Sequence, residues 1–405
     1  MTISTACANT SAHTRLVTKP LVLRFVSIVA SSIGFYLPLA AVPMYAATSG
    51  STAAGGLANG ALLVATVAGE LATPGFVARV GYRWALAIGL TLLGAPALVL
   101  LTTSSFGAVF AVNAVRGVGF AITVTAGGAL TAQLIPDTRR GEGLALVGLV
   151  GGVPALVALP FGAWAATHWG FGPVFVLTAV APLLAVVTVP GLPGRVATAG
   201  KHHGVVSSLR RPELSRPAVL FATSAAAAGV VVTYLPLALA HHAAWVAPLA
   251  LLLQPAASTA GRWVAGRLGD RSGQPRLLAP GLALSICGVV AMAVTGSDAL
   301  VLAGAAIFGT GFGVLQNATL SLMYARVTES GFSAVSAIWN AGYDLGMAVG
   351  AAGVAALVAT VGYGPAFLVT ALVMVPALWL ARRETDDVAE PIIVVPDLAT
   401  APVAA

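Results

Sequence analysis

The chain has 405 residues, of which 58% are hydrophobic and only 8% are charged. A soluble domain is about 45–50% apolar and about 25% charged, so this composition excludes a soluble globular protein and equally excludes a disordered chain. The net charge of +7 raises the question of a nucleic-acid partner, but the basic residues recur between long apolar stretches instead of forming one patch. The composition therefore predicts a polytopic membrane protein that binds no nucleic acid.

Twelve apolar stretches are long enough to cross the hydrocarbon core of a bilayer, which takes about 20 residues. The first six are predicted at 21–43, 53–78, 82–103, 106–134, 144–165 and 172–190. The second six are predicted at 217–240, 243–265, 277–296, 299–325, 333–358 and 364–381. We expect an N-terminal tail at 1–20, a six-helix bundle at 21–190, a central loop at 191–216, a second six-helix bundle at 217–381, and a solvated acidic tail at 382–405.

The basic residues predict how the chain crosses the membrane. The turns near residues 44–55, 103–106, 166–171, 240–243, 295–299 and 359–363 contain no Lys or Arg, whereas the other connections and both tails are rich in them. Because Lys and Arg are retained on the cytoplasmic side, both termini are expected in the cytoplasm. The excess of Arg, Ala, Gly and Val suggests a GC-rich bacterial genome, and hence the inner membrane of a bacterium.

The two halves of the chain repeat each other. The sequence Tyr-Leu-Pro-Leu at 36–39 recurs at 234–237, RGVGFA at 116–121 corresponds to FGTGFG at 308–313, and WGFGPVF at 169–175 corresponds to VGYGPAF at 361–367. The last two pairs share one offset of 192 residues. Parallel six-helix repeats imply a pseudo-two-fold axis along the membrane normal, with a substrate held between the halves near the midplane.

The loop GRLGDRSGQPR at 266–276 resembles the G-x-x-x-D-R-x-G loop of the major facilitator superfamily. Arg116-Gly117 in the fourth span is similar to that family's arginine motif. The resemblance covers about residues 20–382 and implies an all-α membrane protein, with 12 transmembrane helices in two pseudo-symmetric six-helix bundles. It also implies a monomer without cofactor or metal, whose partners are a small-molecule substrate, protons and the lipid bilayer.

The same resemblance implies a cytoplasmic gate that closes in the outward-open state. We expect this gate to contain Gly266, Asp270, Arg271, Gly273, Arg262 and Arg79. The first-half copy of the loop departs from the pattern, because Pro74 replaces the leading glycine and Ala78 replaces the acid. The fifth span likewise keeps only the proline region of the family's antiporter motif, at 159–163.

A charge at the bilayer centre costs about 2.5–3.5 kcal/mol, and three of the charges inside predicted spans stand out. Asp344 lies near the midplane and ends a polar stripe formed by Ser333, Ser336, Asn340 and Asp344. We interpret Asp344, Arg116 and Glu70 as candidate proton-coupling residues, because a carboxyl whose environment alternates can carry a proton. Permanent pairing or packing with a neighbouring helix is the alternative for Asp344 and Arg116. For Glu70, closing the inner gate by pairing with a helix of the opposite half is favoured over direct coupling.

Uncharged side chains inside the spans supply candidate substrate contacts. They are Asn113, Tyr36, Tyr234, Gln254, Gln316, Asn317, Trp339 and Asn340. Each could equally hydrogen-bond or pack between helices. All six His residues fall in loops or tails, which argues against an intramembrane enzyme or a metal site.

These features favour a secondary active transporter that exports a small lipophilic drug, toxin or metabolite, driven by protons, through alternating access. Proton-coupled uptake of a small organic solute, or of an anion held by Arg116, is the main alternative, because one fold serves both directions. A membrane receptor or channel is a more distant alternative, since a channel would normally repeat one pore-lining element around an axis.

Overall fold

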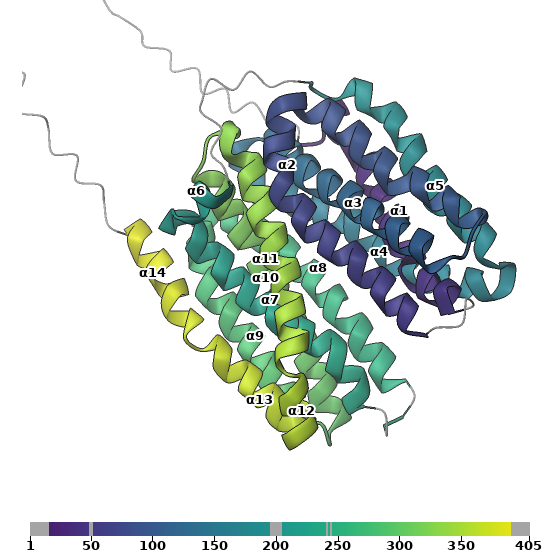
Figure 1. Ribbon diagram of the computed structural model, residues 1–405. Helices are drawn as coiled ribbons and strands as arrows, with labels where there is room; N and C mark the ends of the chain where they lie inside the picture. Colours follow the sequence, from purple (N-terminus) through teal and green to yellow (C-terminus); the bar gives the residue numbers. More distant parts are fainter. Residues whose placement is uncertain (1–15, 48–51, 195–204, 240–241, 244, 390–405) are drawn as a thin grey trace, which may run out of the picture.

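A computed structural model describes residues 16–47, 52–194, 205–239, 242–243 and 245–389. Within these residues the secondary structure is helical, without strands, and ten helical segments are long and apolar enough to span a membrane. Figure 1 shows two groups of helices side by side, one from each half of the chain. Residues 1–15 of the predicted N-terminal tail, residues 195–204 of the central loop and residues 390–405 lie outside the described residues.

The first half contains α1 (Lys19–Ala47), α2 (Thr52–Gly94), α3 (Phe106–Leu134), α4 (Arg140–Trp169) and α5 (Phe171–Ala185), with 3-10 turns at Ala95–Leu101, Asp137–Arg139 and Val186–Gly191. The second half contains α6 (Val205–Leu209), α7 (Pro212–Ala238), α8 (Val246–Ser272), α9 (Leu278–Met292), α10 (Asp298–Ala325), α11 (Phe332–Gly353), α12 (Ala355–Val361), α13 (Tyr363–Met374) and α14 (Ala377–Ala389), with 3-10 turns at Gln274–Leu277 and Glu329–Gly331.

Helix α2 is a helical hairpin. A straight helix of its 43 residues would be about 65 Å long, twice the roughly 30 Å of a hydrocarbon core. Its backbone leaves the helical conformation at Gly81, which has a φ of 80°. Gly117 of α3 lies against the Leu62 carbonyl, and Gly119 lies against the backbone of Leu93, so the two arms of α2 flank the same part of α3. The arms correspond to two of the predicted spans.

The turns of the two halves repeat with the offset found in the sequence. Gly81 and Gly273 have φ angles of 80° and 90°, and Gly170 and Gly362 have φ angles of 81° and 83°. Each pair is 192 residues apart. Glycine is needed at these turns because a side chain disfavours positive φ. The repeat is therefore a repeat of backbone geometry as well as of sequence.

The expectation of a solvated tail from residue 382 is wrong for its first residues, because α14 continues to Ala389. Glu384 is 0% exposed, and its carboxylate lies 2.6 Å from Arg326 and 3.8 Å from Arg216. The Thr385 hydroxyl also donates to the Pro275 carbonyl at 3.1 Å. Pairing with two arginines compensates for the desolvation of the acid and holds this helix on the second half.

One end of the bundle collects the arginine-rich turns, and we call it the arginine-rich end. It carries Arg83, Arg139, Arg140, Arg216, Arg271, Arg326 and Arg382. Arg83 donates to the Leu192 carbonyl, and Arg140 lies over the ring of Phe332 from the other half. The two halves therefore meet at this end.

Candidate functional site

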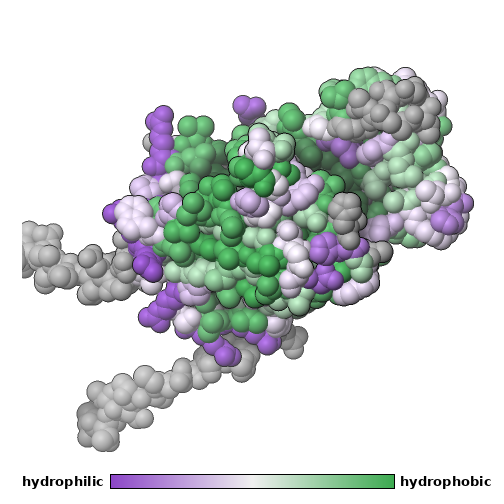
Figure 2. All heavy atoms as spheres, turned by 90° about the horizontal axis from the view of Figure 1, so that it is seen from below, coloured by the Kyte–Doolittle hydropathy of each residue, from purple (hydrophilic) through white to green (hydrophobic). Residues whose placement is uncertain are grey.

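A cavity of about 1030 Å³ lies between the two halves. Residues of α1, α2, α3 and α4 line one side, and residues of α7, α8, α10 and α11 line the other. Figure 2, which views the molecule from below, shows a hollow between its two lobes. The cavity is where the sequence repeat predicts a substrate site.

Two of the three predicted intramembrane charges meet in this cavity. Glu70 comes from α2 of the first half, and Asp344 comes from α11 of the second half. The two carboxyl groups are close enough to interact electrostatically. Glu70 is 1% exposed, and its Oε2 has no hydrogen-bond partner among the described residues.

The polar stripe of α11 faces the first half of the protein. Ser336, Asn340 and Asp344 line the cavity, and the Asn340 amide donates to the Ser336 carbonyl at 2.8 Å. Ser333, one turn earlier, pairs with the hydroxyl of Tyr82 from α2 at 3.0 Å. The polar stripe of α11 therefore places polar groups in the cavity and forms a hydrogen bond between the two halves.

Aromatic rings form much of the remaining cavity wall. They belong to Phe35, Tyr36, Phe120, Tyr324, Trp339 and Tyr343. The rings of Phe35 and Phe120 stack with centroids 3.7 Å apart. Trp339 stacks on Phe221 at 4.3 Å, and its indole N–H donates to Thr319 at 3.1 Å. These contacts fix the rings, so the wall is preorganised.

Arg116 and Asn113 do not line the cavity but lie buried inside the first half. Arg116 donates to the Asn113 side chain at 2.8 Å, to the Gly34 carbonyl at 2.8 Å and to the Leu93 carbonyl at 3.3 Å. Pro38 follows Gly34 by one turn and has no N–H, so it leaves that carbonyl without its helical donor. Arg116 of α3 therefore holds α1, α2 and α3 together through hydrogen bonds.

The other predicted substrate contacts divide into two groups. Tyr36, Gln316, Trp339 and Asn340 line the cavity. Tyr234, Gln254 and Asn317 do not. The Tyr234 hydroxyl donates to the Ala351 carbonyl at 2.7 Å, which ties α7 to α11. Asn317 is instead part of a contact between the halves, described below.

Sequence reasoning missed Arg24 as a cavity residue. This side chain of α1 is 3% exposed and lines the cavity. It donates to the Ser27 hydroxyl at 2.6 Å and to the carbonyls of Gly127 and Thr123 at 3.2 and 3.3 Å. Gly127 leaves the space that the guanidinium occupies. The available signal was a charge inside the first predicted span.

Arg262 also lines the cavity, and it contacts the opposite half. Its guanidinium lies directly against Gly148 of α4, where a side chain would collide with it. Its Nε has no hydrogen-bond partner among the described residues. Because Glu70 and Arg262 are 192 residues apart, equivalent positions of the two halves carry opposite charges.

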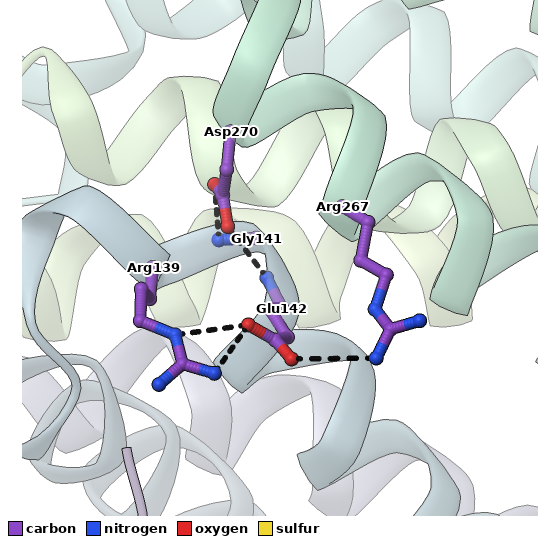
Figure 3. A network of polar contacts seen from close by, with 5 residues as sticks. All are labelled: Arg139, Gly141, Glu142, Arg267 and Asp270. Carbon is purple, nitrogen blue, oxygen red and sulfur yellow. Dashed lines mark hydrogen bonds and ion pairs between the residues drawn. The ribbon is translucent and has the colours of Figure 1, made fainter. Parts of the chain in front are cut away.

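The arginine-rich end is closed by contacts between α4 and α8, which we call the α4–α8 interlock (Figure 3). The Asp270 carboxylate accepts the backbone N–H groups of Gly141 and Glu142 at 2.8 and 2.9 Å. The Asn317 amide donates to the Gly141 carbonyl at 2.9 Å. Gly266 and Gly141 are in backbone contact. Two helices of opposite halves are thus joined directly.

Side-chain charges extend this interlock. Glu142 pairs with Arg139 at 2.7 Å and with Arg267 of α8 at 3.8 Å (Figure 3). Of the predicted gate residues, Gly273 forms the turn after α8, whereas Arg271 and Arg79 are exposed. Sequence reasoning identified Asp270 and Gly266 but missed the residues of α4 that they meet.

The first half lacks the acid of this interlock. Ala78 occupies the position 192 residues before Asp270, and Ser333 lies 192 residues after Gly141. At the equivalent contact, the hydroxyls of Tyr82 and Ser333 form a hydrogen bond instead. The two sides of the closure are therefore unequal, one charged and one uncharged.

A family model of the major facilitator superfamily matches residues 24–335 and, in a second match, residues 249–392. The chain belongs to the major facilitator superfamily. The protein is therefore a multi-pass membrane transporter, and the fold predicted from the repeat and the loop motif is confirmed, with the number of twelve crossings still a prediction.

Solved structures of this superfamily share the fold. The Escherichia coli fucose:proton symporter has a TM-score of 0.76 at 14% identity, over 91% of this chain and 99% of that chain. The human organic anion transporter MFSD10 (TETRAN) has a TM-score of 0.74 at 14% identity, over 89% and 98%. No curated protein sequence matches the chain.

Proposed function

We propose that this transporter exports a small lipophilic compound in exchange for protons, by alternating access. The observation that carries the proposal is the cavity between the halves, which holds one carboxyl group from each half, Glu70 and Asp344. Moving the halves relative to each other changes the surroundings of both groups at once. A carboxyl that alternates between a dry and a wet environment can take up a proton on one side and release it on the other.

The arginine-rich end is assigned to the cytoplasm of a bacterial cell by the positive-inside rule, with both termini on that side. The α4–α8 interlock then closes the cytoplasmic side, and the hollow seen in Figure 2 opens to the outside. Export requires this interlock to break so that a compound can enter from within. Each chain encloses its own cavity, so we propose that the monomer is the working unit.

The proton gradient is sufficient for this work. One elementary charge crossing 100 mV supplies about 2.3 kcal/mol, which one proton delivers in exchange for a neutral compound and two protons deliver in exchange for a monovalent cation. At about 1.36 kcal/mol per tenfold, that sustains a concentration ratio of roughly 50. The aromatic wall favours a lipophilic substrate, and the burial of Arg116 outside the cavity removes the residue on which anion uptake depended.

Inverted membrane vesicles test coupling and direction together. Dyes of cationic, neutral and anionic type are added to energised vesicles, and internal pH and dye accumulation are recorded. We expect at least one dye to accumulate inside while protons leave, and we expect Asp344→Asn to insert normally but abolish the proton movement. The control Asp298→Asn changes an acid that pairs with His242, outside the cavity, and should behave as native. Undiminished uphill transport by Asp344→Asn would refute the coupling role.

A further inference from the structure

The carboxyl pair of the cavity also points to the charge of the substrate, an inference that rests on the proposed function. We propose that the cavity binds a monovalent organic cation with an apolar body, held between the carboxylates of Glu70 and Asp344 and against the aromatic wall. The site thus takes one carboxylate from each half. A bound cation joins the two halves at the point where they must move together.

The two carboxylates of the cavity have no cationic partner among the described residues, unlike several acids elsewhere in the protein. Glu142 pairs with Arg139, and Glu384 pairs with Arg326. Asp270 is satisfied by two backbone N–H groups. By contrast, no ion pair forms at Glu70 or Asp344 in the part of the chain that the structure describes, and Glu70 keeps a buried oxygen without a hydrogen bond. A buried acid in this condition requires a proton or a ligand cation.

The arginines that line the cavity are directed elsewhere. Arg24 donates to carbonyls of α3 and to Ser27, and Arg262 lies against Gly148 of α4. Neither forms an ion pair with Glu70 or Asp344 among the described residues. Arg24 is thus satisfied by carbonyls and a hydroxyl, whereas Arg262, like the two carboxylates, has no counter-ion among the described residues.

The aromatic wall matches the same ligand chemistry. A cation within about 6 Å of an aromatic ring face is attracted by the ring, by about 2 kcal/mol or more when desolvated. Tyr36 and Tyr343 both lie close enough to Asp344 to interact with it electrostatically. The volume of about 1030 Å³ is at the upper end of pockets for drug-sized molecules, which span about 300–1,000 Å³. A lipophilic cation fits both the charge and the wall.

Binding of two matched ions tests the proposal on the full-length protein in lipid nanodiscs. Tetraphenylphosphonium and tetraphenylborate carry the same four phenyl groups and opposite charges, and empty nanodiscs correct for partition into lipid. The native protein should bind the cation at least tenfold more tightly than the anion, which corresponds to about 1.4 kcal/mol. Glu70→Gln and Asp344→Asn keep the side-chain size and should each weaken cation binding tenfold or more. The control Asp298→Asn should leave it unchanged.

Tighter binding of the borate by the native protein, or native affinity for the phosphonium in both variants, would overturn the proposal. The comparison of ions on the native protein needs no variant, so a variant that fails to fold leaves the test decisive. Cation binding without proton-coupled transport would uphold this inference and refute the proposed function. Proton-coupled transport of neutral or anionic dyes, with no preference for the phosphonium, would uphold the proposed function and refute this inference.

Discussion

The α4–α8 interlock predicts that Asp270→Asn destabilises the closed arrangement of the two halves. Asp270 accepts the N–H groups of Gly141 and Glu142 in the first turn of α4. Such N–H groups have no acceptor within their own helix and form the positive end of its dipole. Asparagine keeps the side-chain size but loses the charge and one of the two acceptor oxygens. Because these bonds join opposite halves, their loss destabilises the closed arrangement specifically.

The size of the effect follows from these contacts. A hydrogen bond to a charged group contributes about 1.5–3 kcal/mol, and a charge at a helix terminus contributes about 0.3–1 kcal/mol. Asp270 is only partly buried, so solvent screening favours the lower part of this range. We expect a loss of about 2 kcal/mol, which shifts the balance between closed and open arrangements by roughly 30-fold.

Spin labels measure this shift directly. Trp84 and Trp379 are exposed side chains, one on each half, and can carry labels after Cys7 and Cys287 are replaced. In the parent protein we expect one distance between the labels, and in Asp270→Asn a second, longer distance with a substantial population.

The matched control is Arg271→Gln, which changes the exposed neighbour and should keep the parent distribution. If Asp270→Asn also keeps it, the interlock does not hold the two halves together and the reasoning is refuted.

Three further variants separate the roles assigned to single residues. A double variant, with Ala78→Asp added to Asp270→Asn, supplies an acid to the first turn of α11. The same distance measurement should then show a ratio of closed to open arrangements about tenfold higher than in Asp270→Asn alone. Glu384→Gln breaks the buried pair with Arg326 and should lower the free energy of unfolding by about 3–5 kcal/mol, seen as a lower thermal midpoint; an unchanged midpoint would contradict the pairing. Arg116→Ala leaves the Gly34 carbonyl without its donor and should destabilise the protein by about 1–3 kcal/mol, with native phosphonium affinity in the folded fraction; lost affinity at native stability would place Arg116 in the site.

The fold was predictable from the sequence because its signals are local and repeated. Apolar length, the alternation of basic connections and the shared offset of 192 residues each report on the backbone path without reference to distant contacts. The four glycines with positive φ show why the repeat is detectable, since the turns depend on glycine at the same offset. The sequence contains no comparable local signal for which side chains will contact each other.

The candidate site was predictable only in part for this reason. An intramembrane charge indicates that a partner is required, but the partner depends on helix rotation and packing. Arg116 and Arg24 show the difficulty, because both are charges inside the first half, yet Arg24 lines the cavity and Arg116 satisfies backbone carbonyls freed near prolines. The tail acid Glu384 became buried because Arg326 and Arg216, far away in sequence, converge on it.

The two halves have different roles at the positions where the sequence departs from the repeat. The halves share turns and helix packing, but Glu70 in the first half corresponds to Arg262 in the second, and Ala78 corresponds to Asp270. The acid of the interlock is thus on the second half, while a buried acid of the cavity is on the first. A symmetric pair of interlocks would close both sides with equal strength, whereas a charged contact beside the Tyr82–Ser333 hydroxyl pair gives one strong and one weak side. We therefore expect the α2–α11 side to separate first when the arginine-rich end opens, and this is the side that carries Glu70 and Asp344.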